Sequence, residues 1–425
     1  MQEHHFNSYA DAREWLYGLR NRGSKYGIDR MAILADVLGH PQRSYPAIHV
    51  AGTNGKGSVC AMLERVYREG GYRTGLFSSP HLVHQGERIR IDGIPMEEEG
   101  ILHWTNVLIP ECRDLAKDDP DNHPSFFEWM TAMAFLQFKE SAVDVAVLET
   151  GLGGRLDSTN VVLPEVSVIT SIGLDHVEIL GNSFAKIAAE KGGIIKEGVP
   201  VVLGKMPVEA REVLERMARD RGSKTYPVED HFANGKLPQT NLAGNVQRWN
   251  AGVVQIVCEV LASRFPLAQD VIERGLSSVE IKGRWSLEWV GERKLIFDGA
   301  HNKDALEALR WNLESLASKE GKKPVIVAGF TGNAARAKEM LPMLKDHSSR
   351  VILVRPAHDR GLPPEDYNQS EEVGNVQNIF PRPGVCNIDP VDATVVVTGS
   401  LYLVAEVMGR LEEGSSGSRQ QQLQD

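Results

Sequence analysis

Apolar residues near the N-terminus of the chain recur with the spacing of one helix face. Ala12, Trp15, Leu16 and Leu19 fall at positions i, i+3, i+4 and i+7, and Ser8 precedes them as a candidate N-cap. The pattern predicts a helix that begins just after Ser8.

Short apolar runs and helical patterns alternate along the rest of the chain, with one break near residues 276–284. Before the break, strands are predicted at 47–51, 143–149, 166–170 and 200–204, and a long helix from about Asn245. After it, strands are predicted at 294–298, 324–329, 350–355 and 394–398, and helices at 303–316 and 401–411. Such alternation is typical of mostly parallel sheets covered by helices on both faces. We therefore predict an α/β protein with two domains, residues 1–283 and 284–411, and a disordered polar tail, 412–425.

The overall composition narrows the class of protein. The 425 residues include 47 Lys and Arg against 57 Asp and Glu, and the net charge of −10 argues against a nucleic-acid partner. No apolar run approaches the roughly 20 residues that span a bilayer, and the polar N-terminus lacks the apolar core of a signal peptide. The four cysteines are far apart, as is typical of reduced cytosolic thiols. We expect a cytoplasmic protein with no nucleic-acid or membrane partner.

The strand predicted at 47–51 runs directly into a glycine loop, Gly52–Ser58, and then into a helix. Backbone N–H groups of such a loop can surround phosphate oxygens, and the N-terminus of the helix adds a positive partial charge. Lys56 would supply a point charge for the β- and γ-phosphates, and the Ser58 hydroxyl would face the phosphates or their magnesium. The spacing G-x-x-G-K-G-S is a variant of the common G-x-x-x-x-G-K-[ST] loop. A glycine turn without a ligand is the alternative interpretation.

Polar side chains also stand at the predicted carboxyl ends of other strands, the edge where open parallel sheets bind ligands. Glu149 ends one strand, His176 follows the next, and Asp298 and His301 follow the first strand of the second series. A carboxylate at this edge suits Mg²⁺, which combines few protein carboxylates with phosphate oxygens. The residues indicate a magnesium–nucleotide enzyme whose second domain closes over the phosphates. A kinase, an ATPase and a ligase all fit this pattern.

Each of these residues also has a structural interpretation. Glu149 could cap a helix or pair with Arg155, and Asn302 could be an N-cap with Asp298 as a structural residue. Taken alone, Lys191 is interpreted as a surface lysine.

Motifs along nearly the whole chain, from about residue 9 to 410, occur in the order of one known family. They are HVAGTNGKGSV (49–59), SSPHL (78–82), GERIRIDG (86–93), FFEWMTAMAF (126–135), LETGLGGRLDSTN (148–160), SIGLDHVEILG (171–181), AEKGGIIK (189–196), QRWNA (247–251), GR (283–284), DGAHN (298–302) and TGSLYL (398–403). Together they resemble the Mur ligase superfamily, specifically its folylpolyglutamate synthase/dihydrofolate synthase branch. The resemblance implies a P-loop-type, ATP-binding Mur ligase domain in residues 1–283 and a smaller Rossmann-like, glutamate ligase-type domain in residues 284–411.

The resemblance also implies a reaction. ATP would phosphorylate a carboxylate to an acyl phosphate, and the amine of L-glutamate would then displace the phosphate. The implied acids are dihydropteroate and folate glutamates, so the implied enzyme is a bifunctional dihydrofolate synthase/folylpolyglutamate synthase. Its implied cofactors are ATP and Mg²⁺, with a monovalent cation as a further candidate, and we expect a monomer.

Functional residues of the family carry over onto matching positions of this chain. The resemblance implies contacts to ATP from Asn54, Gly55, Lys56, Gly57, Ser58, Asn250, Arg284 and Asp298, and magnesium ligands in Ser79, Glu149, His176 and Lys191. The pterin substrate is implied to lie near Tyr26, Gly27, Ile28, Asp29, Arg30, Phe127, Leu156, Asp157 and Ser158. Lys191 matches a lysine that the family carbamylates with CO₂, which reverses its interpretation as a surface residue. Catalytic roles are implied for Lys56, Lys191, Asp298 and His301.

The chain departs from the family pattern in its C-terminal half and just before it. Gly332–Arg336 stands where the family often carries an acidic D-K-D segment, and Ile281 and Lys282 precede Gly283 where a tryptophan is common. Val246 replaces a common His or Phe. These differences leave open a Mur-type ligase that acts on a different carboxylate and amine. A non-catalytic nucleotide-binding regulator is a further hypothesis.

Overall fold

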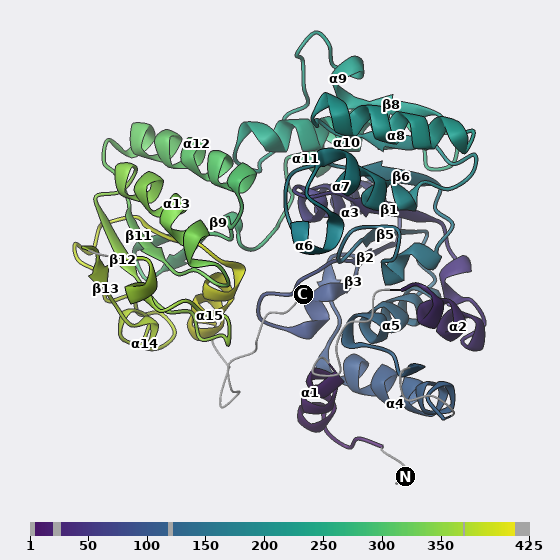
Figure 1. Cartoon of the computed structure of the whole chain (residues 1–425), viewed down its shortest axis with the longest axis horizontal. Coiled ribbons are helices and arrows are strands. Elements are labelled where there is room, and N and C mark those ends of the chain that lie inside the picture. The colour runs from purple at the N-terminus through teal and green to yellow at the C-terminus, as the bar shows by residue number, and fades with distance from the viewer. Residues whose placement is uncertain (1–4, 20–26, 118–121, 369, 413–425) are drawn as a thin grey trace.

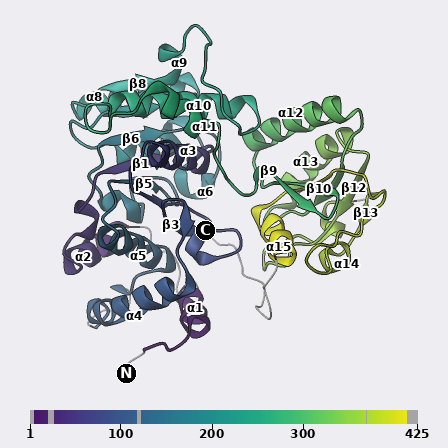
Figure 2. The ribbon, with the colours of Figure 1, turned by 180° about the vertical axis from the view of Figure 1, so that it is seen from behind.

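The computed structural model describes residues 5–19, 27–117, 122–368 and 370–412, which form two sheets with helices around them (Figure 1). We call these the N-terminal and the C-terminal sheet. They lie side by side, and the C-terminal sheet is on the left in Figure 1 and on the right in the opposite view of Figure 2. Within the described residues, no helix is long and apolar enough to cross a membrane.

The N-terminal sheet has eight strands in the order β4-β3-β2-β5-β1-β6-β7-β8. Their bounds are β1 (Ala47–Ala51), β2 (Thr74–Phe77), β3 (Ile89–Ile91), β4 (Ile94–Pro95), β5 (Val145–Glu149), β6 (Val166–Ile169), β7 (Val201–Leu203) and β8 (Thr225–Pro227). In the part of the sheet ordered β2-β5-β1-β6-β7-β8, all neighbouring strands pair in parallel. At one edge, β3 pairs antiparallel with both β2 and β4. The predicted mostly parallel sheet is therefore confirmed.

Helices cover both faces of the N-terminal sheet because successive strand residues point to opposite sides. In β5, Val145 and Val147 pack with α3 and α10 on one face, and Ala146 and Leu148 pack with α5 on the other. The helices of this part are α1 (Tyr9–Gly18), α2 (Asp29–Val37), α3 (Lys56–Glu69), α4 (Glu98–Leu115), α5 (Phe126–Glu140), α6 (Val177–Leu180), α7 (Phe184–Lys191), α8 (Val208–Asp220), α9 (Val228–His231), α10 (Asn245–Val260) and α11 (Gln269–Leu276).

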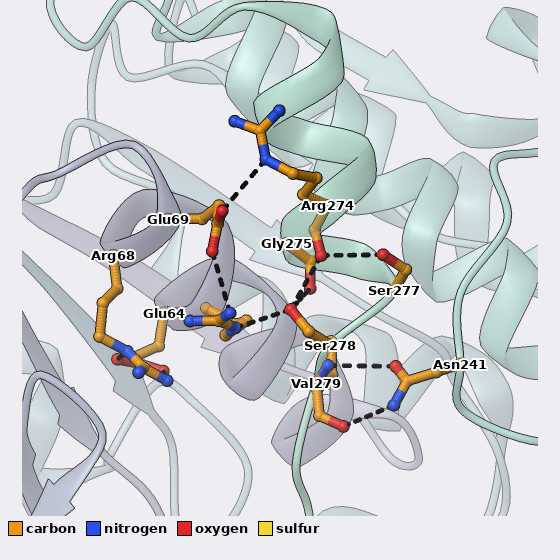
Figure 3. Close-up of polar contacts among 10 residues, drawn as sticks. Glu64, Arg68, Glu69, Asn241, Arg274, Gly275, Ser277, Ser278 and Val279 are labelled. Carbon is orange, nitrogen blue, oxygen red and sulfur yellow. Dashed lines mark hydrogen bonds and ion pairs between the residues drawn. The ribbon is translucent and has the colours of Figure 1, made fainter.

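Helix α3, which follows the glycine loop, is fixed in place by α11. Gly275 of α11 lies so close that an added Cβ would stand 2.7 Å from Cα of Val66 in α3. Around this contact, Arg274 donates to Glu69 at 3.1 Å, and Asn241 forms two hydrogen bonds with the backbone of Val279 (Figure 3). The start of α3, where a phosphate would bind, is thereby anchored through the rest of the helix.

The C-terminal sheet has six strands in the order β13-β12-β11-β14-β10-β9. Its strands are β9 (Arg284–Val290), β10 (Arg293–Asp298), β11 (Val325–Ala328), β12 (Arg350–Leu353), β13 (Glu372–Val373) and β14 (Val395–Thr398), and its helices are α12 (Lys303–Glu320), α13 (Ala334–Asp346), α14 (Val376–Ile379) and α15 (Leu401–Leu411). Only the β9–β10 pair is antiparallel among the described pairs. Helices α12 and α13 pack on one face, and α14 and α15 on the other.

A loop from the N-terminal part of the chain packs into the core of the C-terminal part. Leu82, from the loop after β2, is 7% exposed and belongs to the apolar core under α15, beside Val404. An added Cβ on Gly283 would lie 3.1 Å from Leu82 and 3.3 Å from Val404. The first strand of the C-terminal sheet begins at the next residue, Arg284. This supports a domain boundary between residues 283 and 284, which we keep as a proposal.

Candidate active site

One cavity of about 620 Å³ lies between the two sheets, at the carboxyl ends of their strands. All of the residues predicted to hold ATP phosphates, nucleotide and magnesium line it, together with His301: Asn54, Gly55, Lys56, Gly57, Ser58, Ser79, Glu149, His176, Lys191, Asn250, Arg284, Asp298 and His301. Segments more than 200 residues apart along the chain, such as 53–58 and 298–305, therefore meet at a single site.

The glycine loop connects β1 to α3 and is held in a fixed shape by the loop after β6. Gly55 has a positive φ of 83° and is the N-cap of α3, so this position favours glycine. Thr53 accepts a hydrogen bond from the Gly173 amide at 3.0 Å and donates to the Gly173 carbonyl at 3.2 Å. Ser58 accepts from Gln247 of α10 at 3.2 Å. These hydrogen bonds hold the loop in place, and the first residues of α3 line the cavity.

Two lysines share one carbonyl beneath the loop. Lys56 Nζ lies 3.0 Å from the Gly52 oxygen, and Lys191 Nζ lies 2.8 Å from the same oxygen. Lys191 ends α7 and is 3% exposed. Burial, and next the positive charge of Lys56, lower the pKa of Lys191 to about 7. The interpretation of Lys191 as a surface lysine, made from that residue alone, is therefore wrong.

Glu149 ends β5 beside the glycine loop. Its Oε2 accepts from the Ser79 amide at 3.1 Å, and an added Cβ on Gly57 would be 3.7 Å from its Oε1. Arg155, the alternative partner of Glu149, pairs with Glu190 at 2.9 Å. The carboxylate therefore lies within reach of a phosphate held by the loop.

The remaining predicted metal ligand, His176, is exposed at the start of α6 and lines the same cavity. Among the described residues, no three His, Cys, Asp or Glu side chains stand together as a ready ligand set. Mg²⁺ keeps water and phosphate oxygens as ligands and takes one or two protein carboxylates, a type of group that Glu149 offers in this cavity.

The C-terminal sheet contributes an acid, an arginine and a histidine. Asp298 ends β10 opposite Arg284 of β9 and accepts from the Ala300 amide at 3.0 Å. Burial raises the pKa of Asp298 to about 6, although Arg284 acts in the opposite direction. His301 Nδ1 lies 2.7 Å from the Gly299 carbonyl, and because a carbonyl only accepts, Nδ1 is the donor.

Of the residues predicted for the pterin, Tyr26 lies outside the described residues. The others do not line this cavity. Arg30 of α2 forms an ion pair with Glu128 of α5 at 3.0 Å, and Ser158 lies 3.0 Å from Thr131. Gly27, Ile28 and Asp29 precede or begin α2, and Leu156 and Asp157 precede the short helix η5 (Ser158–Val161). This second group lies on α2, α5 and η5.

The two groups meet at Gly151. Phe127 of the pterin group packs so closely against Gly151 that an added Cβ would lie 2.5 Å from its ring, and Gly151 itself lines the cavity. Asp157 accepts from the amides of Leu152 and Thr159, each at 3.0 Å, and burial raises its pKa. These bonds hold the loop between the two groups, so a positioning role fits Asp157.

Several cavity residues had no role in the sequence analysis. Gln247 links Ser58 to Asn250, and Lys205 Nζ stands 4.8 Å from the ring of Trp249. Asp175 and Asp304 line the cavity from the two different sheets. Asp175 could have been found from the sequence, because it is a polar residue close to a glycine after the end of a strand. Asp304 lies within a helix, so no such pattern marks it.

Comparison with known proteins identifies the family. Residues 50–226 match the family model described as Mur ligase middle domain. The chain is 34% identical, over 441 residues, to the dihydrofolate synthase/folylpolyglutamate synthase of Bacillus subtilis, with 96% of this chain and 100% of the relative covered. The chain belongs to the folylpolyglutamate synthase/dihydrofolate synthase family.

Solved structures of folylpolyglutamate synthases share the whole architecture. The crystal structure of the Thermotoga maritima folylpolyglutamate synthase superposes with a TM-score of 0.80 at 32% identity, covering 97% of this chain and 98% of the other. The Mycobacterium tuberculosis enzyme complexed with ADP and AMPPCP gives 0.79 at 27% identity, covering 93% and 97%. The predicted Mur-ligase fold, with a larger mostly parallel sheet and a second α/β domain, is confirmed.

Proposed function

We propose that this folylpolyglutamate synthase family member is an ATP-dependent ligase that joins L-glutamate to dihydropteroate and to folate glutamates. The observation that carries the proposal is a cavity lined by Lys56 and Glu149 of one sheet and by Asp298 and His301 of the other. The names of its relatives support both acids, since the Bacillus subtilis relative is named for both activities. The nucleotide is supported by the ADP and AMPPCP complexes of the Mycobacterium tuberculosis enzyme.

The chemistry explains why such a cavity is needed. A free carboxylate is a poor acyl donor, so transfer of the γ-phosphoryl group to it creates an acyl phosphate with a good leaving group. The glutamate amine then attacks the acyl carbon, and inorganic phosphate leaves with the electron pair of the broken C–O bond. Both the acid and ATP are anions, so their approach requires local positive charge inside a chain whose net charge is −10.

Residues of the N-terminal sheet would supply that charge. The Lys56 ammonium and the first amides of α3 would bind the β- and γ-phosphates, and Asn54 and Ser58 would orient them. Ser79, Glu149, His176 and a carbamylated Lys191 would hold Mg²⁺, which when bound neutralises charge on the transferred phosphoryl group. The lowered pKa of Lys191, about 7, supports carbamylation because CO₂ reacts with the neutral amine. We retain a monovalent cation as a further candidate cofactor.

Residues of the C-terminal sheet would complete the site. Arg284, Asp298 and Asn250 would contact the nucleotide across the cavity, and His301 would stand near the reacting groups. The residues around α2, α5 and η5 would bind the pterin, with Phe127 and Gly151 between that region and the phosphates. We further propose that the enzyme is a monomer and that it is located in the cytoplasm. Both of these statements rest on the sequence.

Phosphate release from ATP tests the proposal. With the full chain and Mg²⁺, we expect release when L-glutamate is present together with dihydropteroate or tetrahydrofolate, and background release when either substrate is omitted. D-glutamate and L-aspartate serve as control amines. Turnover only with a different acid or a different amine would favour another Mur-type reaction. ATP binding without any turnover would favour a regulator.

A further inference from the structure

Asn302 lies where groups from both sheets meet. It follows β10 and is the N-cap of α12, where its Oδ1 accepts from the Ala305 amide at 3.0 Å. Its side chain is nevertheless directed across the gap between the sheets. Nδ2 donates to Oδ1 of Asn54 at 3.0 Å and to Oδ2 of Asp175 at 3.1 Å. Asn302 is 5% exposed, so these bonds are made away from bulk water.

Asn54, in turn, is fixed to the N-terminal sheet. Its amide donates to Ser171 Oγ at 3.0 Å, and its carbonyl accepts from Thr170 Oγ1 at 2.7 Å. Its side chain faces the C-terminal sheet, with Nδ2 at 3.4 Å from Oδ1 of Asn302 and from Oδ2 of Asp304. The two asparagine amides therefore pair reciprocally, and each belongs to a segment that is held by its own sheet.

We propose that Asn302 is a positioning residue for the ligase reaction. It holds the glycine loop at a fixed position relative to the end of β10, beside which Asp298 and His301 lie. The inference rests on the proposed function. Its basis is the chemistry of the junction, because a primary amide offers two donors and an acceptor in one plane. In Asn302, one N–H serves Asn54, the other serves Asp175, and the oxygen caps α12.

The residues of this junction lie on the cavity wall, so a shift there moves the reacting groups relative to each other. Asn54, Asp175, Asn302 and Asp304 all line the cavity. An added Cβ on Gly173 would stand 2.3 Å from Asp304 Oδ2, which shows how closely α12 approaches the loop after β6. A misplacement of about 1 Å can cost about 10²-fold in rate even when every catalytic group is present.

Two substitutions separate the bridge from the helix cap. Serine and aspartate are both good N-caps, so Asn302→Ser and Asn302→Asp both keep an acceptor for the Ala305 amide. Asn302→Ser shortens the side chain and removes the amide donors. Asn302→Asp keeps the size of the side chain but places a carboxylate against Asp175.

Steady-state kinetics of the full-length variants, with ADP binding and thermal denaturation in parallel, test the proposal. We expect kcat for glutamate ligation to fall by about 10-fold to 10²-fold in Asn302→Ser, and further in Asn302→Asp. ADP affinity should also weaken, because the proposed nucleotide contacts come from both sheets. Tm should change by only a few degrees, because each sheet keeps its own apolar core. A fall in kcat that merely follows the loss of folded protein would overturn the proposal, as would an unchanged kcat.

A double-mutant cycle with Asn54→Ala isolates the contact itself. If the amide pair positions the loop, Asn302→Ser should have a smaller further effect on kcat once Asn54 is alanine, because only the bond from Asn302 to Asp175 remains to be lost. Independent, multiplicative effects would contradict the proposal. Absence of a glutamate product with the unchanged chain would instead refute the proposed function.

Discussion

At the scale of single residues, burial decides which chemistry a side chain offers. Lys56 and Lys191 bind the same carbonyl, yet Lys191 is 3% exposed and its pKa is lowered to about 7. The sequence contains no signal for that difference. Lys191 ends a short amphipathic helix, and its burial depends on the glycine loop, which is about 140 residues earlier in the chain. Its role in the sequence analysis came from the family resemblance alone.

Lys56→Ala should reduce phosphate release by at least about 10²-fold, because a neutral side chain cannot offset charge on the transferred phosphoryl group. The measurement is ATP-dependent phosphate release with both substrates present. Tm should change little, since Lys56 contributes to a polar surface of the cavity. A rate equal to that of the unchanged chain would exclude the role assigned to Lys56.

Lys191 should carry a carbamate in the presence of CO₂. At a fixed CO₂ pressure, carbamylation should increase as the pH rises through about 7, because the neutral amine is the form that reacts. A ¹³C NMR signal from ¹³CO₂ would report the adduct, and Lys191→Gln is the control that should lose it. A spectrum with no such difference between the two proteins would contradict the assignment.

His49 gives a test of the pH dependence of stability. It is fully buried in β1, its Nε2 lies 2.8 Å from Thr159 Oγ1, and burial lowers its pKa to about 3. The unfolded chain therefore binds a proton at a higher pH than the folded chain, so stability falls as the pH drops below about 6.5.

Between pH 7 and pH 5, His49 should account for a loss of roughly 2 kcal/mol of unfolding free energy. Urea denaturation at the two pH values should show a smaller loss in His49→Leu. His103→Gln, which removes an exposed histidine, should behave like the unchanged chain. Equal losses in all three proteins would show that His49 is not the titrating group.

At the scale of helices and strands, periodicity located part of the regular elements. β1 has the bounds predicted for it, and the helix predicted from Asn245 begins at that residue as α10. The predicted cap Ser8 accepts from its helix, and so does Asn302, for which an N-cap was the alternative interpretation. Many elements were not predicted, among them the strand β2, the helices α2, α4, α5, α8, α11 and α13, and the strand β9. β9 lies at the edge of its sheet and exposes Trp289 and Leu287, so its pattern does not resemble that of a buried strand.

The packing of α11 on α3 gives a matched pair of glycine substitutions. Gly275→Ala places a Cβ 2.7 Å from backbone and side-chain atoms of Val66, so overpacking should cost about 1–3 kcal/mol. Gly409→Ala, in α15, places its Cβ 3.8 Å from Val83 and should instead stabilise by about 0.5–1 kcal/mol. Thermal denaturation should therefore move Tm in opposite directions, and a rise in both would contradict the described contact between α3 and α11.

At the scale of the whole molecule, the site exists because two sheets present their carboxyl edges to one cavity. The sequence predicted both series of strands and the polar residues at their ends, since these depend on local patterns. It could not predict which side chains cross between the sheets. Leu82 packs into the core of the C-terminal sheet, and Asn54 pairs with Asn302, through contacts between distant segments.

The same scale explains how an acidic protein accommodates anionic substrates. Lys56, Arg284 and the start of α3 bring positive charge to the cavity, which four carboxylates also line: Glu149, Asp175, Asp298 and Asp304. The net charge of −10 is distributed over the rest of the chain. A local positive field of this kind is worth more inside a cavity, where water is partly excluded, than on an open surface.

The central claim is that an acyl phosphate forms on the acid before glutamate attacks it. The direct measurement uses dihydropteroate labelled with ¹⁸O in its carboxylate, together with ATP, Mg²⁺, L-glutamate and the full chain, followed by mass spectrometry. The account predicts a product with one added glutamyl unit and released phosphate that carries one ¹⁸O from the carboxylate. Unlabelled phosphate accompanying that product, or no glutamyl product at all, would contradict it.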